Sequence, residues 1–398
     1  MRPGRISFLF LNVGHTYAHL FMLLYPTVVL ALEAEFQRPY GELLALATPG
    51  FVAFGAGALP AGWLGDRWSR RGMMTVFFIG LGLSSILTGL ARTPIEIAAG
   101  LTLIGVFASI YHPVGIAMVV GGAERVGRAL GVNGVWGNRG VAAAALVAGG
   151  LTDFVGWRAA VSVPGALALL TGICHMAFAR RQPADAGAGS AAKAGAAGVT
   201  REVQIRVFGV LIVASLLGSL VFHSLTVGMP KVFDERLAGL ADTTFGIGGL
   251  LSVIYAVAAF TQILVGWMID RYPLKPVFLA VVALQAPLFL AAASLSGPAM
   301  LAGALAMMLL VFGQIPINDT LVARNTTDAW RARVYAVKFA LSLGVGAGTV
   351  PMVAYIHATG GGFATLFTVL AAFAAIITLA VLFLPPERRR QVAVAAGE

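Results

Sequence analysis

The sequence predicts an all-α membrane protein with twelve transmembrane helices, arranged as two pseudo-symmetric six-helix bundles. Three observations support this fold class: long apolar segments recur along the chain, one polar segment lies near its middle, and one motif occurs in both halves. Of the 398 residues, 59% are hydrophobic and 11% are charged, and the mean hydropathy is +0.88. Ordinary soluble domains contain about 25% charged residues. The composition therefore excludes a soluble protein.

Twelve apolar segments are long enough to cross the hydrocarbon core of a bilayer, which is about 30 Å thick. Short charged loops separate them. The first segment is too long for the core of a signal peptide and has no convincing cleavage site, so we expect it to remain as the first helix. The expected spans are residues 6–31, 41–64, 73–91, 94–121, 129–152, 158–179, 207–230, 244–268, 276–295, 298–322, 334–357 and 362–384.

The basic residues are distributed unevenly between the two sides of the expected bundle. Twenty-one of the 27 Lys and Arg residues lie in or beside segments on the side of the N-terminus, five lie on the opposite side, and Arg139 lies within a span. Acidic residues outside the spans divide equally. This positive-inside pattern predicts a multi-pass protein of the bacterial inner membrane with both termini in the cytoplasm. The net charge of +10 reflects this topology and does not indicate a nucleic-acid partner.

One long polar segment divides the chain. Residues 180–206 are rich in Ala and Gly and carry scattered charges, as is typical of a flexible cytoplasmic linker. We therefore expect an N-terminal bundle over residues 1–179, a C-terminal bundle over 207–384 and a cytoplasmic tail over 385–398. The only cysteine, Cys174, lies within the sixth span, so no disulfide is expected within the chain.

The same motif follows the second span of each half. GWLGDRWSRR begins at Gly62, and GWMIDRYPLK begins 204 residues later at Gly266. Pro113 and Pro316, in the fourth span of each half, are separated by 203 residues. Matched halves around a central loop predict a transporter that works by alternating access, with its substrate site near the midplane between the halves.

The first copy of the motif resembles the loop motif of the major facilitator superfamily, G-x-L-a-D-r-x-G-r-k/r, and the second copy is similar to it. The sequence departs from it at Ser69, where the family has Gly, and at Pro273 in the second copy. The resemblance implies the fold of that superfamily and secondary transport.

The charges of the motif predict a conformational latch. Asp66 can lie near the N-terminus of a neighbouring helix, while the arginines face anionic headgroups, so the loop can stabilise one conformation. Arg70 and Arg71 can equally serve only as positive-inside anchors. The latch residues are Gly62, Asp66, Arg67, Arg70, Arg71, Gly266, Asp270 and Arg271.

A narrower resemblance covers residues 111–140, which are similar to spans four and five of the fosmidomycin-resistance-like group in an aromatic-His-Pro element and a G-N-x-G element. That group exports an anionic phosphonate antibiotic and other compounds, so the resemblance implies efflux. This chain differs at Arg139, where the group has an apolar residue, and at Ala145, where such exporters often have Pro.

Arg139, His15 and His112 are expected at one depth in the membrane. At 1.5 Å per residue, Arg139 lies about 16 Å from the start of its span, and the two histidines lie about 14 Å from the cytoplasmic ends of theirs. An ionisable group within a span marks a functional site unless a structural partner explains it. We therefore expect a cationic substrate site. Its members are Asn12, His15, His19, Tyr111, His112, Asn138, Arg139 and, from the other half, His223.

Arg139 determines the expected charge of the solute. Its guanidinium presents fixed donors and keeps its proton, so it favours a carboxylate, phosphate or phosphonate. The alternative is that Arg139 caps backbone carbonyls or pairs with the other half. Likewise, His112 can satisfy a carbonyl that is freed by Pro113.

His15 and His19 are four residues apart on one helical face, a spacing that can also bind a transition metal. Against this alternative, a nearby Arg139 would repel the cation, and no acid or further Cys lies at that level to compensate. The sequence therefore predicts no metal site and no cofactor.

Proton coupling requires a group that changes charge near neutral pH. The histidines can do so, because the unperturbed pKa of imidazole is about 6.5. Asp319 and Lys338 are expected to pair at a shallow depth, with either a structural role or a role in coupling.

The sequence contains no nucleotide-binding loop and no convincing catalytic constellation, so an enzyme is not expected. We expect a monomeric secondary transporter that moves a small organic, anionic solute, with proton-coupled export favoured. The alternatives are proton-coupled uptake of an organic anion, transport of a transition metal, and a membrane receptor that has lost transport.

The topology can be tested with a single Cys at Ser190, in the expected cytoplasmic linker. We expect an impermeant thiol reagent to label this residue only after the cells are permeabilised. Labelling in intact cells would show that the linker lies outside.

Overall fold

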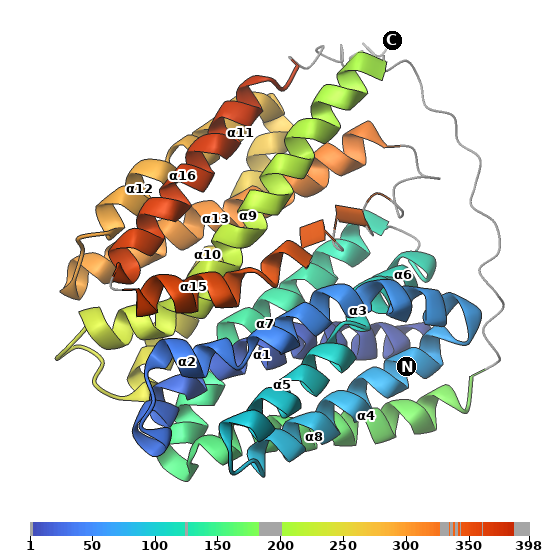
Figure 1. Cartoon of the computed structure of the whole chain (residues 1–398). Helices are drawn as coiled ribbons and strands as arrows, with labels where there is room; N and C mark the ends of the chain where they lie inside the picture. The colour runs from blue at the N-terminus through green and yellow to red at the C-terminus, as the bar shows by residue number, and fades with distance from the viewer. Residues whose placement is uncertain are drawn as a thin grey trace.

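The computed structural model describes residues 3–123, 126–182, 201–326, 334, 337–338, 341–342, 344–359 and 361–385. Within these residues every regular element is a helix (Figure 1). In chain order the helices are α1 (Pro3–Phe36), α2 (Tyr40–Ala45), α3 (Thr48–Arg67), α4 (Arg70–Gly89), α5 (Pro94–Ala108), η1 (Tyr111–Gly115), α6 (Ile116–Gly121), α7 (Val126–Val155), α8 (Trp157–Ala179), α9 (Arg201–Arg236), α10 (Thr244–Arg271), α11 (Leu274–Ala283), α12 (Gln285–Ala292), α13 (Gly297–Asn325), α15 (Thr349–Ala358) and α16 (Gly362–Leu382).

Ten helical segments within the described residues are long and apolar enough to cross a membrane. The expected fifth span is present as α7, but its Gly, Asn and Arg residues leave it less apolar than these ten. The expected eleventh span, residues 334–357, lies partly outside the described residues. The all-helical membrane fold is therefore confirmed, while the count of twelve spans stays a prediction.

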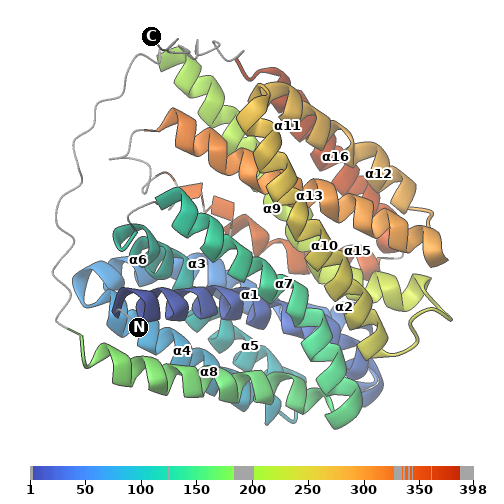
Figure 2. The same cartoon turned by 180° about the vertical axis from the view of Figure 1, so that it is seen from behind.

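The helices form two groups that converge at one end of the molecule. Figures 1 and 2 show α1–α8 in one group and α9–α16 in the other, with the groups meeting where α2 and α15 lie side by side and diverging toward the two termini. We call the end where α8 ends and α9 begins the linker end, and the opposite end the closed end. Most of the expected linker lies outside the described residues, but α9 begins at residue 201, six residues before the expected boundary.

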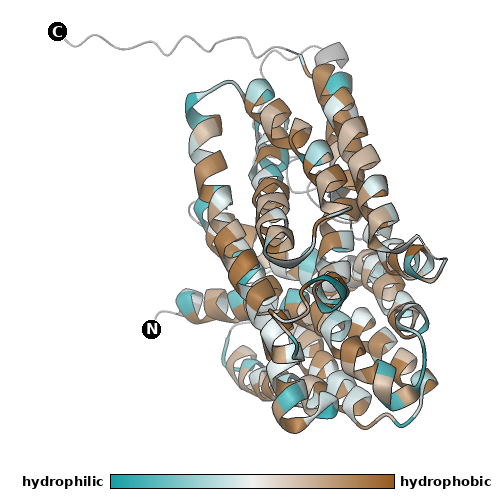
Figure 3. Ribbon diagram, turned by 90° about the vertical axis from the view of Figure 1, so that its left-hand side faces the viewer, coloured by the Kyte–Doolittle hydropathy of each residue, from teal (hydrophilic) through white to brown (hydrophobic). Residues whose placement is uncertain are grey.

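The distribution of hydropathy fits a membrane environment. Figure 3 shows apolar residues along the lengths of the helices and hydrophilic residues concentrated near helix ends and loops. Many large apolar side chains are exposed on the outer surface of the bundle, among them Leu59 at 71% and Phe260 at 69%. Such exposure is costly in water and favourable in lipid.

Polar contacts join the two groups at the closed end. Lys231 of α9 donates a hydrogen bond to Glu33 of α1 over 2.6 Å, and the Phe245 amide at the start of α10 donates one to Asp153 of α7, also over 2.6 Å. The gap that Tyr255 helps to line between α1, α7, α9 and α10 has a volume of only about 10 Å³, which barely admits one water molecule. The route between the groups is therefore shut at this end.

The backbones of α7 and α10 are in direct contact near the closed end. A Cβ atom at Gly248 would lie 2.2 Å from the carbonyl oxygen of Ala145, and one at Gly149 would lie 2.2 Å from the carbonyl oxygen of Thr244. Small residues are needed where membrane helices approach so closely. The two glycines therefore permit closure.

Gly248→Ala tests this contact. We expect it to lower the melting temperature by several degrees, because overpacking at a helix contact costs about 1–3 kcal/mol, and to weaken the closure between α7 and α10. Gly249→Ala is the matched control, because a Cβ at Gly249 meets no atom within 4 Å. Equal stability of the two variants would contradict the contact.

Candidate functional site

Pro113 interrupts the helix that follows α5. Proline has no amide hydrogen and its ring clashes with the preceding turn, so the regular α-helical bonding pattern cannot pass through it. Residues 111–115 form a single π-helical turn, η1, before α6 continues. Such turns often occur at functional sites. This one places Tyr111 and His112 in the interior, where both are buried.

Asn133 of α7 connects three helical segments through hydrogen bonds. Its side-chain amide donates to the Tyr111 hydroxyl over 2.8 Å and to Asn12 Oδ1 over 3.0 Å. Its backbone carbonyl accepts a hydrogen bond from His15 Nδ1 over 2.7 Å. The Tyr111 hydroxyl in turn donates to the Leu11 carbonyl over 2.8 Å. These hydrogen bonds connect α1, η1 and α7 in one defined arrangement.

Glycines on α7 allow α1 to approach closely beside this network. A Cβ at Gly137 would lie 2.7 Å from the His15 ring, and one at Gly140 would lie 2.2 Å from the Thr16 carbonyl oxygen. The Thr16 hydroxyl donates to the Trp136 carbonyl over 2.8 Å. The position of the His15 ring is thus fixed by packing as well as by a hydrogen bond.

Three imidazoles meet at this point, and we call His15, His19 and His112 the histidine cluster. The Nε2 atoms of His15 and His19 are 3.2 Å apart, and both rings lie 5.5 Å from the ring of His112 between centroids. One nitrogen of each ring can be chosen so that all three lie within 4.8 Å of one another. Tyr111 stacks on His15 with 4.9 Å between centroids.

Two phenylalanines of α3 link the histidine cluster to the other half. The Phe54 ring packs edge-on to His112 at 5.9 Å, and the Phe51 ring packs edge-on to His223 of α9 at 6.5 Å. Phe51 and Phe54 are one helical turn apart. His223 belongs to the other group of helices and lies across the junction, in contact with Phe51.

The structure does not bring Arg139 into the histidine cluster. Arg139 is exposed, and its guanidinium lies 4.9 Å from the ring centroid of Trp136. It follows Gly137 by two residues, which corresponds to about 200° around the helix, so it projects away from the face of α7 that packs on His15. Asn138 is half-buried. Of the expected site, the network and cluster unite Asn12, His15, His19, Tyr111 and His112.

Asn133 is a site residue that the sequence analysis did not include. It precedes Gly137 by four residues and therefore shares the face of α7 that packs on α1, but only the structure identifies that face.

The expected latch residues lie at the linker end. Arg70, the first residue of α4, donates to the Asp66 carboxylate from Nη2 over 2.7 Å and from Nε over 3.2 Å. Ser69, which departs from the family motif, is the N-cap of α4 and accepts the amide hydrogen of Gly72 over 3.0 Å. Ser is a favourable residue at that position. Gly62 faces the π turn, since its Cβ would lie 3.2 Å from Pro113.

The second copy of the motif matches the first in one respect. Arg67 lies over Trp63 at 5.3 Å, and Arg271 lies over Trp267 at 4.1 Å. Asp270 is exposed, and a Cβ at Gly266 meets no atom within 4 Å. The second copy therefore lacks the close packing that Gly62 provides in the first.

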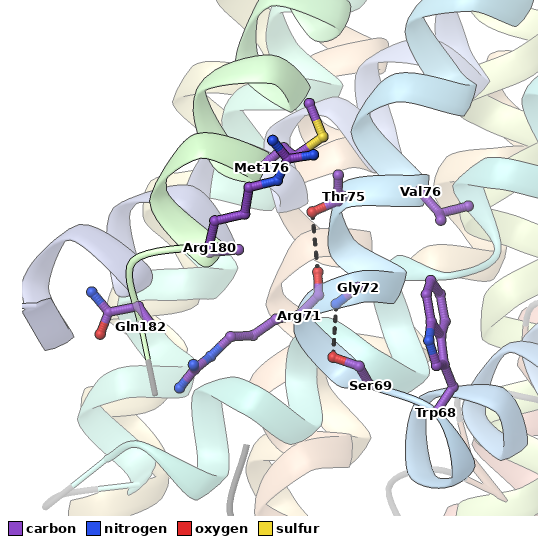
Figure 4. Close-up of a pocket in the computed structure, with 10 residues that line it drawn as sticks. Trp68, Ser69, Arg71, Gly72, Thr75, Val76, Met176, Arg180 and Gln182 are labelled. Atoms are coloured by element: carbon purple, nitrogen blue, oxygen red, sulfur yellow. Dashed lines mark hydrogen bonds between the residues drawn. The ribbon is translucent and has the colours of Figure 1, made fainter. Parts of the chain in front are cut away.

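A surface pocket of about 350 Å³ lies at the linker end between α4 and α8 (Figure 4). Arg71 and Arg180 line it from opposite helices. His175 of α8 is hydrogen-bonded to Thr75 of α4 over 2.8 Å and holds α8 against α4. None of the pocket residues belongs to the histidine cluster, so the pocket is a separate surface feature.

In the other half, Lys338 forms the expected ion pair with Asp319 of α13. Gln314, one helical turn before Asn318, accepts a hydrogen bond from Gln285 of α12 over 3.1 Å. These bonds lie within the second group of helices.

Two helical groups that close at one end around buried polar side chains define a polytopic membrane transport protein. The chain belongs to the Major Facilitator Superfamily, because the model of that family matches residues 13–337. The predicted superfamily is therefore confirmed. The narrower similarity to the fosmidomycin-resistance-like group stays a prediction.

Solved structures of transporters share this fold. A bacterial homolog of the human lysosomal transporter Spinster, inward-facing and unoccupied, aligns with 16% identity and a TM-score of 0.73, over 96% of this chain and 95% of that one. A D-xylose–proton symporter aligns with 13% identity and a TM-score of 0.73, over 96% and 98%.

One curated relative is similar in sequence. Puromycin resistance protein pur8 of Streptomyces alboniger is 33% identical over 161 residues, which are 38% of this chain and 32% of that protein. The match therefore spans about a third of the relative's length.

Asp66→Asn tests the latch. We expect turnover to fall several-fold, while substrate affinity and melting temperature change little, because an exposed ion pair adds little stability. Glu42→Gln is the matched control, since it breaks another exposed i,i+4 pair, with Arg38, outside the motif. Normal turnover of Asp66→Asn at normal expression would exclude a latch.

Proposed function

We propose that this protein is a secondary active transporter of the inner membrane that exports a small organic anion by proton-coupled transport, with its termini in the cytoplasm. The observation that carries this proposal is the histidine cluster near the junction of the two helical groups, in which His15 and His112 are buried and His19 is half-buried. The mechanism is alternating access, in which the groups rock about this central site.

Imidazole can couple the movement of the anionic solute to that of the proton through its change of charge. A protonated cluster is positive and attracts an anion, and a deprotonated cluster is neutral and releases it. His223 lies across the junction, so protonation on either side of Phe51 would change the attraction between the two groups. Because charged groups are costly within a bilayer, solute and proton compensate each other best when both are bound.

Two comparisons favour export. The partial match is to a resistance protein, and the chain resembles a group that exports an anionic antibiotic. The two helical groups diverge toward the linker end (Figure 1), which is the side from which an exporter loads its solute in the predicted topology.

Arg139 supplies a further positive charge for an anionic solute. It is exposed on α7, and it has no ion-pair partner among the described residues. Because it is exposed outside the cluster, we assign it the role of attracting the solute before the solute reaches the cluster.

Variants of Arg139 test the anionic character of the solute. Arg139→Lys should weaken binding and Arg139→Ala should weaken it further, because lysine keeps the charge but loses the planar fork. The probes are small carboxylates and phosphonates that include fosmidomycin, with puromycin for comparison. Affinity and melting temperature are measured on the same purified proteins. Normal anion affinity of Arg139→Ala would remove this residue from the proposal.

Proton coupling is tested in proteoliposomes with the best-binding anion. An outward anion gradient should drive protons outward together with the anion. His19→Gln should abolish this movement, and His175→Gln, which changes a buried histidine outside the cluster, should leave it largely intact. Anion transport without proton movement would contradict coupling.

A further inference from the structure

We propose that the histidine cluster is a binding site for a divalent transition metal ion of the zinc class. The ligands are one ring nitrogen each from His15, His19 and His112. This inference goes beyond the proposed transport activity, because metal binding requires no solute.

The spacing of the nitrogens suits a metal. Zinc binds imidazole nitrogen at about 2.0–2.1 Å, so two nitrogens in a tetrahedral site are about 3.3 Å apart. The Nε2 atoms of His15 and His19 are 3.2 Å apart, and the third nitrogen lies within 4.8 Å of both. Small rotations of the His112 ring would complete a three-nitrogen site.

The surroundings of His15 favour a ligand role. Its Nδ1 lies 2.7 Å from the Asn133 carbonyl, which accepts only, so Nδ1 carries the hydrogen and Nε2 keeps its lone pair for the cluster. Metal-binding histidines commonly donate their second nitrogen to a carbonyl or carboxylate in this way. Tyr111 and Gly137 hold the ring from its sides. His15 is therefore oriented before a metal arrives.

Repulsion of a metal ion by Arg139, which the sequence analysis raised against a metal site, does not apply in the folded protein. Arg139 was expected to repel a cation, but it is exposed and projects from another side of α7. Three neutral imidazoles leave a bound ion with a double positive charge and an open coordination position. A hydroxide or an anionic oxygen of the solute would fill the open position and reduce the positive charge. Only binding of the solute oxygen rests on the proposed function.

The metal and the coupling proton would use the same lone pairs. Binding of one therefore excludes the other. Zinc should thus inhibit proton-coupled transport if the proposed function is correct.

Cobalt binding to the purified full-length protein tests the site directly. The protein carries no polyhistidine tag, and the probe is Co²⁺ alone, read from its visible absorption and displaced by Zn²⁺. Wild type should bind one ion with the spectrum of a four-coordinate site. His19→Gln and His112→Gln should each weaken binding at least about tenfold. His175→Gln, the matched buried histidine outside the cluster, should bind as wild type does.

Melting temperatures show whether each variant is folded. If one of the two cluster variants does not fold, the other one is used for the test. Absence of cobalt binding by wild type would overturn the proposal, and so would wild-type affinity in a folded His19→Gln or His112→Gln protein. Proton movement in proteoliposomes is measured without metal. A protein that binds no cobalt can therefore still show proton-coupled transport, and a protein that moves no protons can still bind cobalt.

Discussion

The close approach of α1 and α7 fixes the polar centre of this protein. Gly137 and Gly140 allow the two helices to touch, and any larger residue at Gly137 would occupy the place of the His15 ring, 2.7 Å away. A bilayer core supplies no water, so the polar groups brought together here must satisfy one another. Asn133 does so by bonding to α1 and η1 at once. The His15 ring is consequently held in place by the packing of α1 on α7 and by its bond to Asn133.

The two helical groups diverge toward the linker end (Figures 1 and 2). Contacts between the two helical groups concentrate at the closed end, where Glu33 meets Lys231 and Asp153 meets the start of α10. The Glu33–Lys231 ion pair is partly buried, and the Asp153 contact is a hydrogen bond from a backbone amide, so both must break before this end can open. The histidine cluster is in contact with both helical groups through Phe54, which packs on His112, and Phe51, which packs on His223 of the second group.

Depth along a helix could be predicted from the sequence, but direction around it could not. Counting residues placed His15 and His112 at one level, and their rings lie 5.5 Å apart. The same count placed Arg139 beside them, yet it projects from another side of α7, because the face that packs on α1 is chosen by Gly137 and its neighbours. Fold class followed from apolar segments and the repeated motif, which are local. The bond between Glu33 and Lys231 joins residues far apart in the chain and left no local signal.

The central claim is that transport requires the two helical groups to separate at the closed end. The direct measurement joins cysteines at Glu33 and Lys231 with a cleavable bifunctional thiol reagent, in a Cys174→Ser background. Cross-linked protein should lose transport in proteoliposomes, and cleavage of the linker by a reductant should restore it. Undiminished transport by fully cross-linked protein would contradict the account.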